Sequence, residues 1–140
     1  MQQYNNKKIV LAFGTFDILH PGHESYLAQA KSLGDLLVVA VARDKNVQKT
    51  KGALPQNNEN QRLQRIKELK IVDRALLGFL DDPYQIIERV KPDVIALGYD
   101  QTTYTDILVQ ELKSRKINCQ IVRLKPYHPE KYKSSLLKRK

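Results

Sequence analysis

Residues 9–23 of this 140-residue chain read IVLAFGTFDILHPGH, and they indicate the fold more clearly than any other stretch. The first five residues are apolar without polar alternation, which is typical of a strand buried on both faces of a parallel sheet. A turn that begins with Gly14 follows, and Pro21 opens a stretch with helical spacing. In open α/β sheets the first strand-to-helix turn is the usual place for a phosphate group. This stretch therefore predicts both a fold class and a candidate binding site.

The remaining sequence repeats the alternation of strand and helix. Further apolar runs predict strands, so that the five expected strands cover residues 9–13, 36–41, 75–77, 94–97 and 121–124. Helical spacing of apolar residues predicts four helices, which carry Tyr26, Leu27, Ala30 and Leu33 before Gly34; Leu63, Ile66 and Leu69; Ile86, Ile87 and Val90 between Pro83 and Pro92; and Ile107, Leu108 and Leu112 after a Thr105 cap. We expect a Rossmann-like three-layer α/β/α sandwich with a five-stranded parallel sheet, in a single domain over residues 1–140. Residues 43–58 are expected to form one long functional loop.

Composition and charge limit the kinds of protein and of binding partner that we expect. The apolar fraction of 41% suits a globular protein, and no apolar run is long enough to cross a bilayer. The N-terminus lacks the layout of a signal peptide, and the one cysteine, Cys119, excludes an internal disulfide, so we expect a cytoplasmic protein. A net charge of +9 favours a polyanionic partner, such as nucleic acid, an acidic membrane surface or a phosphorylated small molecule.

The turn at residues 14–23 has the chemistry of an anion site. Gly14 allows a ligand to approach the backbone closely, and the free N–H groups of the following helix attract anions. His20 and His23 lie three residues apart at the start of that helix, which brings the two imidazoles together. The spacing matches neither the dinucleotide-binding glycine motif nor the P-loop, and nothing nearby completes a zinc site, so no protein-held metal is predicted.

The sequence GTFDILHPGH, residues 14–23, resembles the signature of the cytidylyltransferase-like nucleotidyltransferases. These enzymes make CDP-glycerol, CDP-ethanolamine, ADP-heptose and, in archaea, FAD. The resemblance covers nearly the whole chain, since later motifs appear in the family's order: Gly52 with Arg62, Val72-Asp73, residues 97–101, and Ser134-Ser135. It implies an enzyme in which an acceptor phosphate oxygen attacks the α-phosphorus of a nucleoside triphosphate and expels pyrophosphate.

The resemblance also implies roles for individual residues. The expected catalytic residues, which contact the triphosphate or the acceptor phosphate, are His20, His23, Lys51 and Arg62. The residues expected to line the phosphate site or hold its loop are Gly14, Thr15, Phe16, Asp17, Gly22 and Lys49. Gly98, Tyr99, Asp100 and Gln101 would meet the base and ribose, and Ser134 and Ser135 the β- and γ-phosphates. One departure concerns Arg62: the position two residues earlier, commonly acidic in the family, is Asn60, and the nearest carboxylate is Glu59. This leaves the orientation of Arg62 open, with Arg65 as a competing candidate, and Lys45 is an alternative to the two loop lysines.

The branch of the family decides the substrates. Residues 41–45, 51–52, 75–78 and 97–103 resemble the archaeal-type FAD synthases, which favours ATP as donor and FMN as acceptor. Transfer from CTP to glycerol 3-phosphate or a related phospho-alcohol is the alternative, followed by adenylyl transfer to a sugar phosphate. The resemblance further implies Mg2+ bound to the triphosphate and a homodimer. A non-catalytic nucleotide- or nucleic-acid-binding module, motivated by the basic charge, is the remaining hypothesis.

Overall fold

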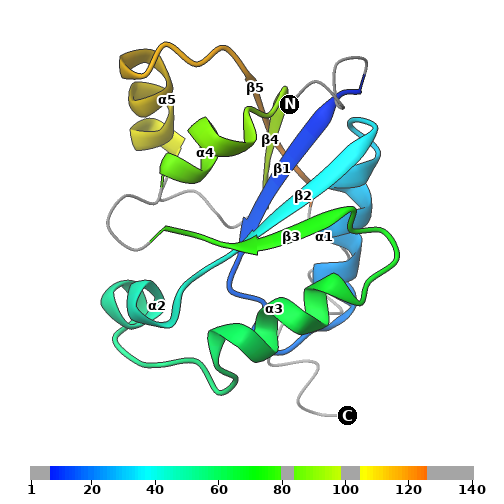
Figure 1. Ribbon diagram of the computed structural model, residues 1–140, viewed down its shortest axis with the longest axis vertical. Helices are drawn as coiled ribbons and strands as arrows, with labels where there is room; N and C mark the ends of the chain where they lie inside the picture. The colour runs from blue at the N-terminus through cyan, green and yellow to red at the C-terminus, as the bar shows by residue number, and fades with distance from the viewer. Residues whose placement is uncertain (1–6, 80–83, 99–104, 126–140) are drawn as a thin grey trace.

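The computed structural model describes residues 7–79, 84–98 and 105–125. Five parallel strands form one sheet in the order β3-β2-β1-β4-β5 (Figure 1). Their bounds are β1 Ile9–Gly14, β2 Leu36–Val41, β3 Arg74–Leu77, β4 Val94–Leu97 and β5 Gln120–Arg123. Each strand lies within one or two residues of its predicted position, and the parallel sheet is confirmed.

Helices cover both faces of the sheet, as the predicted three-layer fold requires. Their bounds are α1 Pro21–Lys31, α2 Asp44–Lys51, α3 Glu59–Lys67, α4 Gln85–Val90 and α5 Thr105–Ser114. One buried cluster joins alternate strand residues, such as Val10 and Val39, to Leu27 of α1 and Ile66 of α3. The opposite cluster joins Leu11, Val38 and Ile95 to residues of α4 and α5. Figure 1 accordingly shows α1 and α3 on one side of the sheet and α4 and α5 on the other.

Aspartates at the amino ends of the strands hold neighbouring strands in register. Asp35, just before β2, accepts a hydrogen bond from Lys8 N, and Asp93, just before β4, accepts one from Ile9 N, both at 2.8 Å. Asp73, just before β3, accepts from Leu37 N at 2.7 Å and from Lys31 Nζ at 2.6 Å. Burial raises the pKa of the Asp73 carboxyl, but these hydrogen bonds and the lysine charge outweigh it, so the pKa lies below its ordinary value.

The prediction of one long loop over residues 43–58 is wrong, because residues 44–51 form α2. This helix is short and polar, and Val47 is the one buried side chain among those that the structure describes in it, so the sequence shows no apolar periodicity there. Gly52 ends the helix in the left-handed conformation with φ of 79°, which a glycine adopts without strain. The irregular part of the segment is the α2–α3 connection, residues 52–58. Pro83, predicted to begin the third expected helix, lies outside the described residues.

Candidate active site

The signature loop, residues 14–23, leaves the carboxyl end of β1 and leads into α1. His20 is the N-cap of α1, and its Nδ1 accepts a hydrogen bond from Gly22 N at 3.0 Å. An accepting Nδ1 carries no proton, so the proton of the neutral ring is on Nε2. The second histidine follows one turn later, and the two ring centroids lie 3.9 Å apart with 24° between the planes. The predicted pairing of His20 and His23 is therefore present in the structure.

The buried side chain of Phe16 supports the signature loop. It is only 3% exposed and has a positive φ of 53°, an uncommon conformation for a residue other than glycine. Its ring meets the ring of His23 edge to face, with centroids 5.4 Å apart. A Cβ at Gly14 would lie 2.5 Å from the Phe16 ring, so that position requires glycine. Phe16 is thus a buried support of the histidines, and its expected place at the phosphate-binding strand end stays a prediction.

Gly22 is required for a similar steric reason. A Cβ there would lie 2.8 Å from Cε1 of His20 and 3.0 Å from its Nδ1. The small residue therefore lets the His20 ring fold back over the first turn of α1, where it caps the helix.

Asp17 binds the signature loop to the α2–α3 connection. Its carboxylate accepts hydrogen bonds from Gln56 N at 2.8 Å and Asn57 N at 2.9 Å, and the Asn57 side-chain amide donates to the Asp17 carbonyl oxygen at 2.6 Å. Burial raises the pKa of the Asp17 carboxyl, but these bonds and the nearby Arg62 charge outweigh it, so its pKa lies below the ordinary value. The carboxylate holds two segments together that are about forty residues apart.

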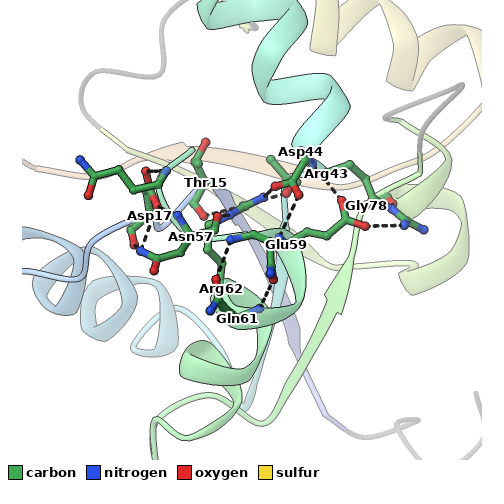
Figure 2. Close-up of polar contacts among 12 residues, drawn as sticks. Thr15, Asp17, Arg43, Asp44, Asn57, Glu59, Gln61, Arg62 and Gly78 are labelled. Carbon is green, nitrogen blue, oxygen red and sulfur yellow. Dashed lines mark hydrogen bonds and ion pairs between the residues drawn. The ribbon is translucent and has the colours of Figure 1, made fainter. Parts of the chain in front are cut away.

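Arg62 is fully buried, at 0% exposure, and its guanidinium is engaged with the protein (Figure 2). Nη1 donates to the carbonyl oxygens of Thr15 at 2.9 Å and Ala42 at 2.8 Å. Nε donates to Asn57 O at 3.0 Å, and Nη2 forms an ion pair with Asp44 Oδ1 at 2.6 Å. Four of the five N–H donors of an arginine are thereby used. One N–H of Nη2 is left over, but because the side chain is fully buried, a substrate phosphate could reach it only after neighbouring residues move.

The ion pair with Asp44 settles the orientation of Arg62, which the sequence left open. Glu59 does not hold Arg62; it pairs with Arg43 Nη1 at 3.2 Å and accepts from Asp44 N at 2.9 Å. Asp44, at the start of α2, is the residue that orients Arg62, as Figure 2 shows. The competing candidate Arg65 is exposed on α3.

The structure describes some of the other predicted site residues but not all of them. Lys49 and Lys51 lie exposed in the last turn of α2, before the α2–α3 connection, and Gly98 follows β4 directly. Tyr99, Asp100, Gln101, Ser134 and Ser135 lie outside the described residues. Reasoning from sequence missed Asp44 and Asn57 as parts of the site, although Asp44 lies in the run 41–45 that carries the branch resemblance. Their positions also depend on α2, which the sequence did not reveal.

Comparison with known proteins identifies the family. A family profile described as cytidylyltransferase-like matches residues 11–140. The chain belongs to the cytidylyltransferase-like family. It is 52% identical over 116 residues to a FAD synthase of Methanosarcina mazei, covering 82% of this chain and 75% of that protein. It is 49% identical to a FAD synthase of Archaeoglobus fulgidus, covering 82% of each.

Solved structures agree on the fold. A crystal structure described as the lipopolysaccharide core biosynthesis protein from Thermoplasma volcanium superposes with a TM-score of 0.82 at 46% identity, covering 87% of this chain and 99% of that one. A pantoate-beta-alanine ligase from Francisella tularensis superposes with a TM-score of 0.62 over 86% of this chain and 59% of that one. Its 19% identity supports the shared fold alone. These findings confirm a nucleotidyltransferase with a Rossmann-like fold.

Within the described residues, no helix has the length and apolar character needed to span a bilayer. In that same part of the chain, no three His, Cys, Asp or Glu side chains gather where they could bind a metal ion.

Proposed function

We propose that this protein transfers AMP from ATP to FMN, giving FAD and pyrophosphate. The observation that carries the proposal is an identity of 48–52% to six archaeal FAD synthases over 82–90% of the chain. The geometry of the signature loop agrees with it, because paired imidazoles at a helix N-terminus suit a triphosphate.

The chemistry needs no nucleophile from the protein. An oxygen of the FMN phosphate attacks the α-phosphorus of ATP, a new phosphorus–oxygen bond forms, and the bond to the bridging oxygen of the β-phosphate breaks. Negative charge builds on the phosphoryl oxygens and on the departing pyrophosphate, so catalysis depends on positioning and on hydrogen-bond donors. His20 offers its Nε2–H as such a donor, and His23 is proposed as the donor nearest the α-phosphate.

Asp17 and Arg62 act in this proposal as positioning residues. Arg62 binds Thr15 O in the signature loop and Asn57 O in the α2–α3 connection, while Asp17 joins the same two segments. These bonds fix where the connection lies against the signature loop. Lys49 and Lys51, which precede the connection, are proposed to reach the triphosphate, since both ammonium groups are exposed.

The remaining binding residues are proposed from the family resemblance. Gly14, Thr15 and Gly22 line the phosphate site with the backbone of the signature loop. Gly98, Tyr99, Asp100 and Gln101 would bind the base and ribose, which suits the position of Gly98 at the carboxyl end of β4. Ser134 and Ser135 would bind the β- and γ-phosphates.

Three further features are proposed: binding of Mg2+ with ATP, a homodimer and a location in the cytoplasm. ATP is expected to bind as its Mg2+ complex, the form in which triphosphates enter such sites. A homodimer follows from the resemblance, and the 55% exposure of Ile18 in the signature loop is consistent with an apolar contact there. Location in the cytoplasm is proposed because the single cysteine suits a reducing compartment.

Labelled ATP tests the reaction directly. With FMN and Mg2+, label in the α-phosphate of ATP should appear in FAD, whereas label in the γ-phosphate should appear in pyrophosphate. Transfer of the γ-label to FMN, or no transfer from either position, would refute the proposed reaction.

A further inference from the structure

The hydroxyl of Tyr26 lies where β1 and β4 separate. In the strand order β3-β2-β1-β4-β5, the chain adds β2 and β3 on one side of β1 and then β4 and β5 on the other. Ligands of open α/β sheets bind at such a switch point, which here lies between β1 and β4. The register of these two strands ends with the pair Ala12 and Ala96. Beyond it, β1 leads into the signature loop and β4 leads to Gly98.

Tyr26 comes from α1 and contacts the backbone of both strands at this point. Its hydroxyl lies 2.8 Å from Ala96 O on β4, to which it donates. It also lies 3.2 Å from Phe13 N, from which it accepts, and 3.2 Å from Phe13 O, which is a second possible acceptor. A hydroxyl has one proton and two lone pairs, so it can donate to β4 while it accepts from β1. One side-chain oxygen thus links the two strand ends.

The ring of Tyr26 is linked to His23 through Phe16. It stacks on Phe16, with centroids 6.4 Å apart and 24° between the planes, and Phe16 in turn meets the ring of His23. Because Phe16 is buried in a conformation with positive φ, its place depends on the side chains packed around it. A displacement of Tyr26 would therefore shift Phe16 and, through it, the ring of His23.

We propose that Tyr26 is a positioning residue that holds the phosphate-binding and base-binding parts of the nucleotide site at a fixed separation. This inference rests on the proposed function, in which one ATP molecule touches both the signature loop and the turn after β4. The hydroxyl fixes the strand ends from which these two segments start, and the ring fixes Phe16 and His23. No atom of Tyr26 needs to contact the substrate.

The test compares Tyr26→Phe with Tyr84→Phe. Tyr84 is a half-buried tyrosine just before α4, on the opposite face of the sheet, so its variant also loses one hydroxyl but leaves the β1–β4 link intact. Both are assayed well below their unfolding temperatures, which separates a change in activity from a loss of stability. We expect Tyr26→Phe to lower kcat/KM for ATP by about ten-fold or more, the scale of a small misplacement of reacting groups, with KM for FMN unchanged.

A kcat/KM for ATP within two-fold of that of Tyr84→Phe would overturn the inference. A rise in KM for FMN that matches a rise in KM for ATP would also overturn it, because it would indicate general damage to the site. If Tyr26→Phe does not fold, Phe16→Leu keeps the hydroxyl link and removes the ring between Tyr26 and His23. That variant should lower kcat and leave KM for ATP nearly unchanged, and wild-type kcat would contradict the proposal. Absence of turnover in the unmodified protein would refute the proposed function instead.

Discussion

The rings of His20 and His23 stack with their centroids 3.9 Å apart. The His20 ring is held by the hydrogen bond from Gly22 N, and the His23 ring is held against Phe16. Contacts within the protein therefore position both imidazoles. Donors that are already oriented cost no reorganisation when charge develops on a substrate, which is the main source of electrostatic catalysis.

Replacing His23 with alanine should reduce turnover and leave the fold intact. The expected loss in kcat is roughly two to three orders of magnitude, the effect of removing one transition-state donor. Steady-state kinetics together with a thermal unfolding curve measure the two quantities. Gln64→Ala, on the exposed side of α3, serves as the control. Wild-type turnover of His23→Ala would contradict the proposed role.

Replacing Gly22 with alanine should displace the His20 ring. The added Cβ would lie 2.8 Å from Cε1 of His20, so the ring must turn away from the N-cap position. Loss of an N-cap costs about 1 kcal/mol, a small part of a domain's stability, while the donor in the site moves. We expect a clear fall in kcat with a small fall in unfolding temperature. Unchanged kcat would show that the position of the His20 ring does not matter.

Replacing Arg62 with methionine should act mainly on stability. The change leaves the partly exposed Asp44 carboxylate and the carbonyl oxygens of Thr15 and Ala42 without their partner, and each buried acceptor left unpaired costs about 1–3 kcal/mol. Arg62→Lys should not restore it, because an ammonium group lacks the planar fork of donors. Denaturant unfolding measures this effect.

Arg65→Met is the matched control, because Arg65 is exposed on the same helix. Its free energy of unfolding should change by about 0.5 kcal/mol or less. A stable Arg62→Met whose only defect is a higher KM would instead support direct contact between Arg62 and a substrate phosphate.

The Asp17 carboxylate should make stability depend on acid pH. Its pKa is lower in the folded than in the unfolded chain, so its contribution is complete above the unfolded value of about 3.9 and disappears as the pH falls through the folded value. Asp17→Asn should therefore lower the unfolding temperature at pH 7, and the difference from wild type should shrink below about pH 4. Thermal unfolding from pH 2.5 to 7 tests this, with the exposed Glu68→Gln as control. A difference that is constant across this range would contradict the prediction.

The loop lysines can be separated by single substitutions. Lys49→Ala and Lys51→Ala should raise KM for ATP, because each would remove a cation that reaches the triphosphate. Lys45, in the first half of the same helix, is exposed as well and provides the matched control. Equal effects of all three substitutions would show that only the net charge of α2 matters.

The sequence predicted the sheet well because its central strands, β1, β2 and β4, are largely buried on both faces, and the edge strands β3 and β5 still carry short apolar runs. The five apolar runs needed no partner to be recognised, and the paired histidines followed from their spacing on one helix turn. The contacts of Arg62 could not be read in this way. They join α3 to the signature loop, to the residue after β2 and to α2, and the polar sequence of α2 gives no periodic signal. Likewise, the link from Tyr26 to Ala96 depends on the order of the strands, which sequence spacing does not specify.

Release of pyrophosphate with Mg2+ tests the proposed reaction, measured for ATP and CTP, each with FMN, glycerol 3-phosphate or no acceptor. We expect release with ATP only when FMN is present, and FAD as the second product. Release with CTP and glycerol 3-phosphate, with none from ATP and FMN, would contradict it while keeping the class of reaction.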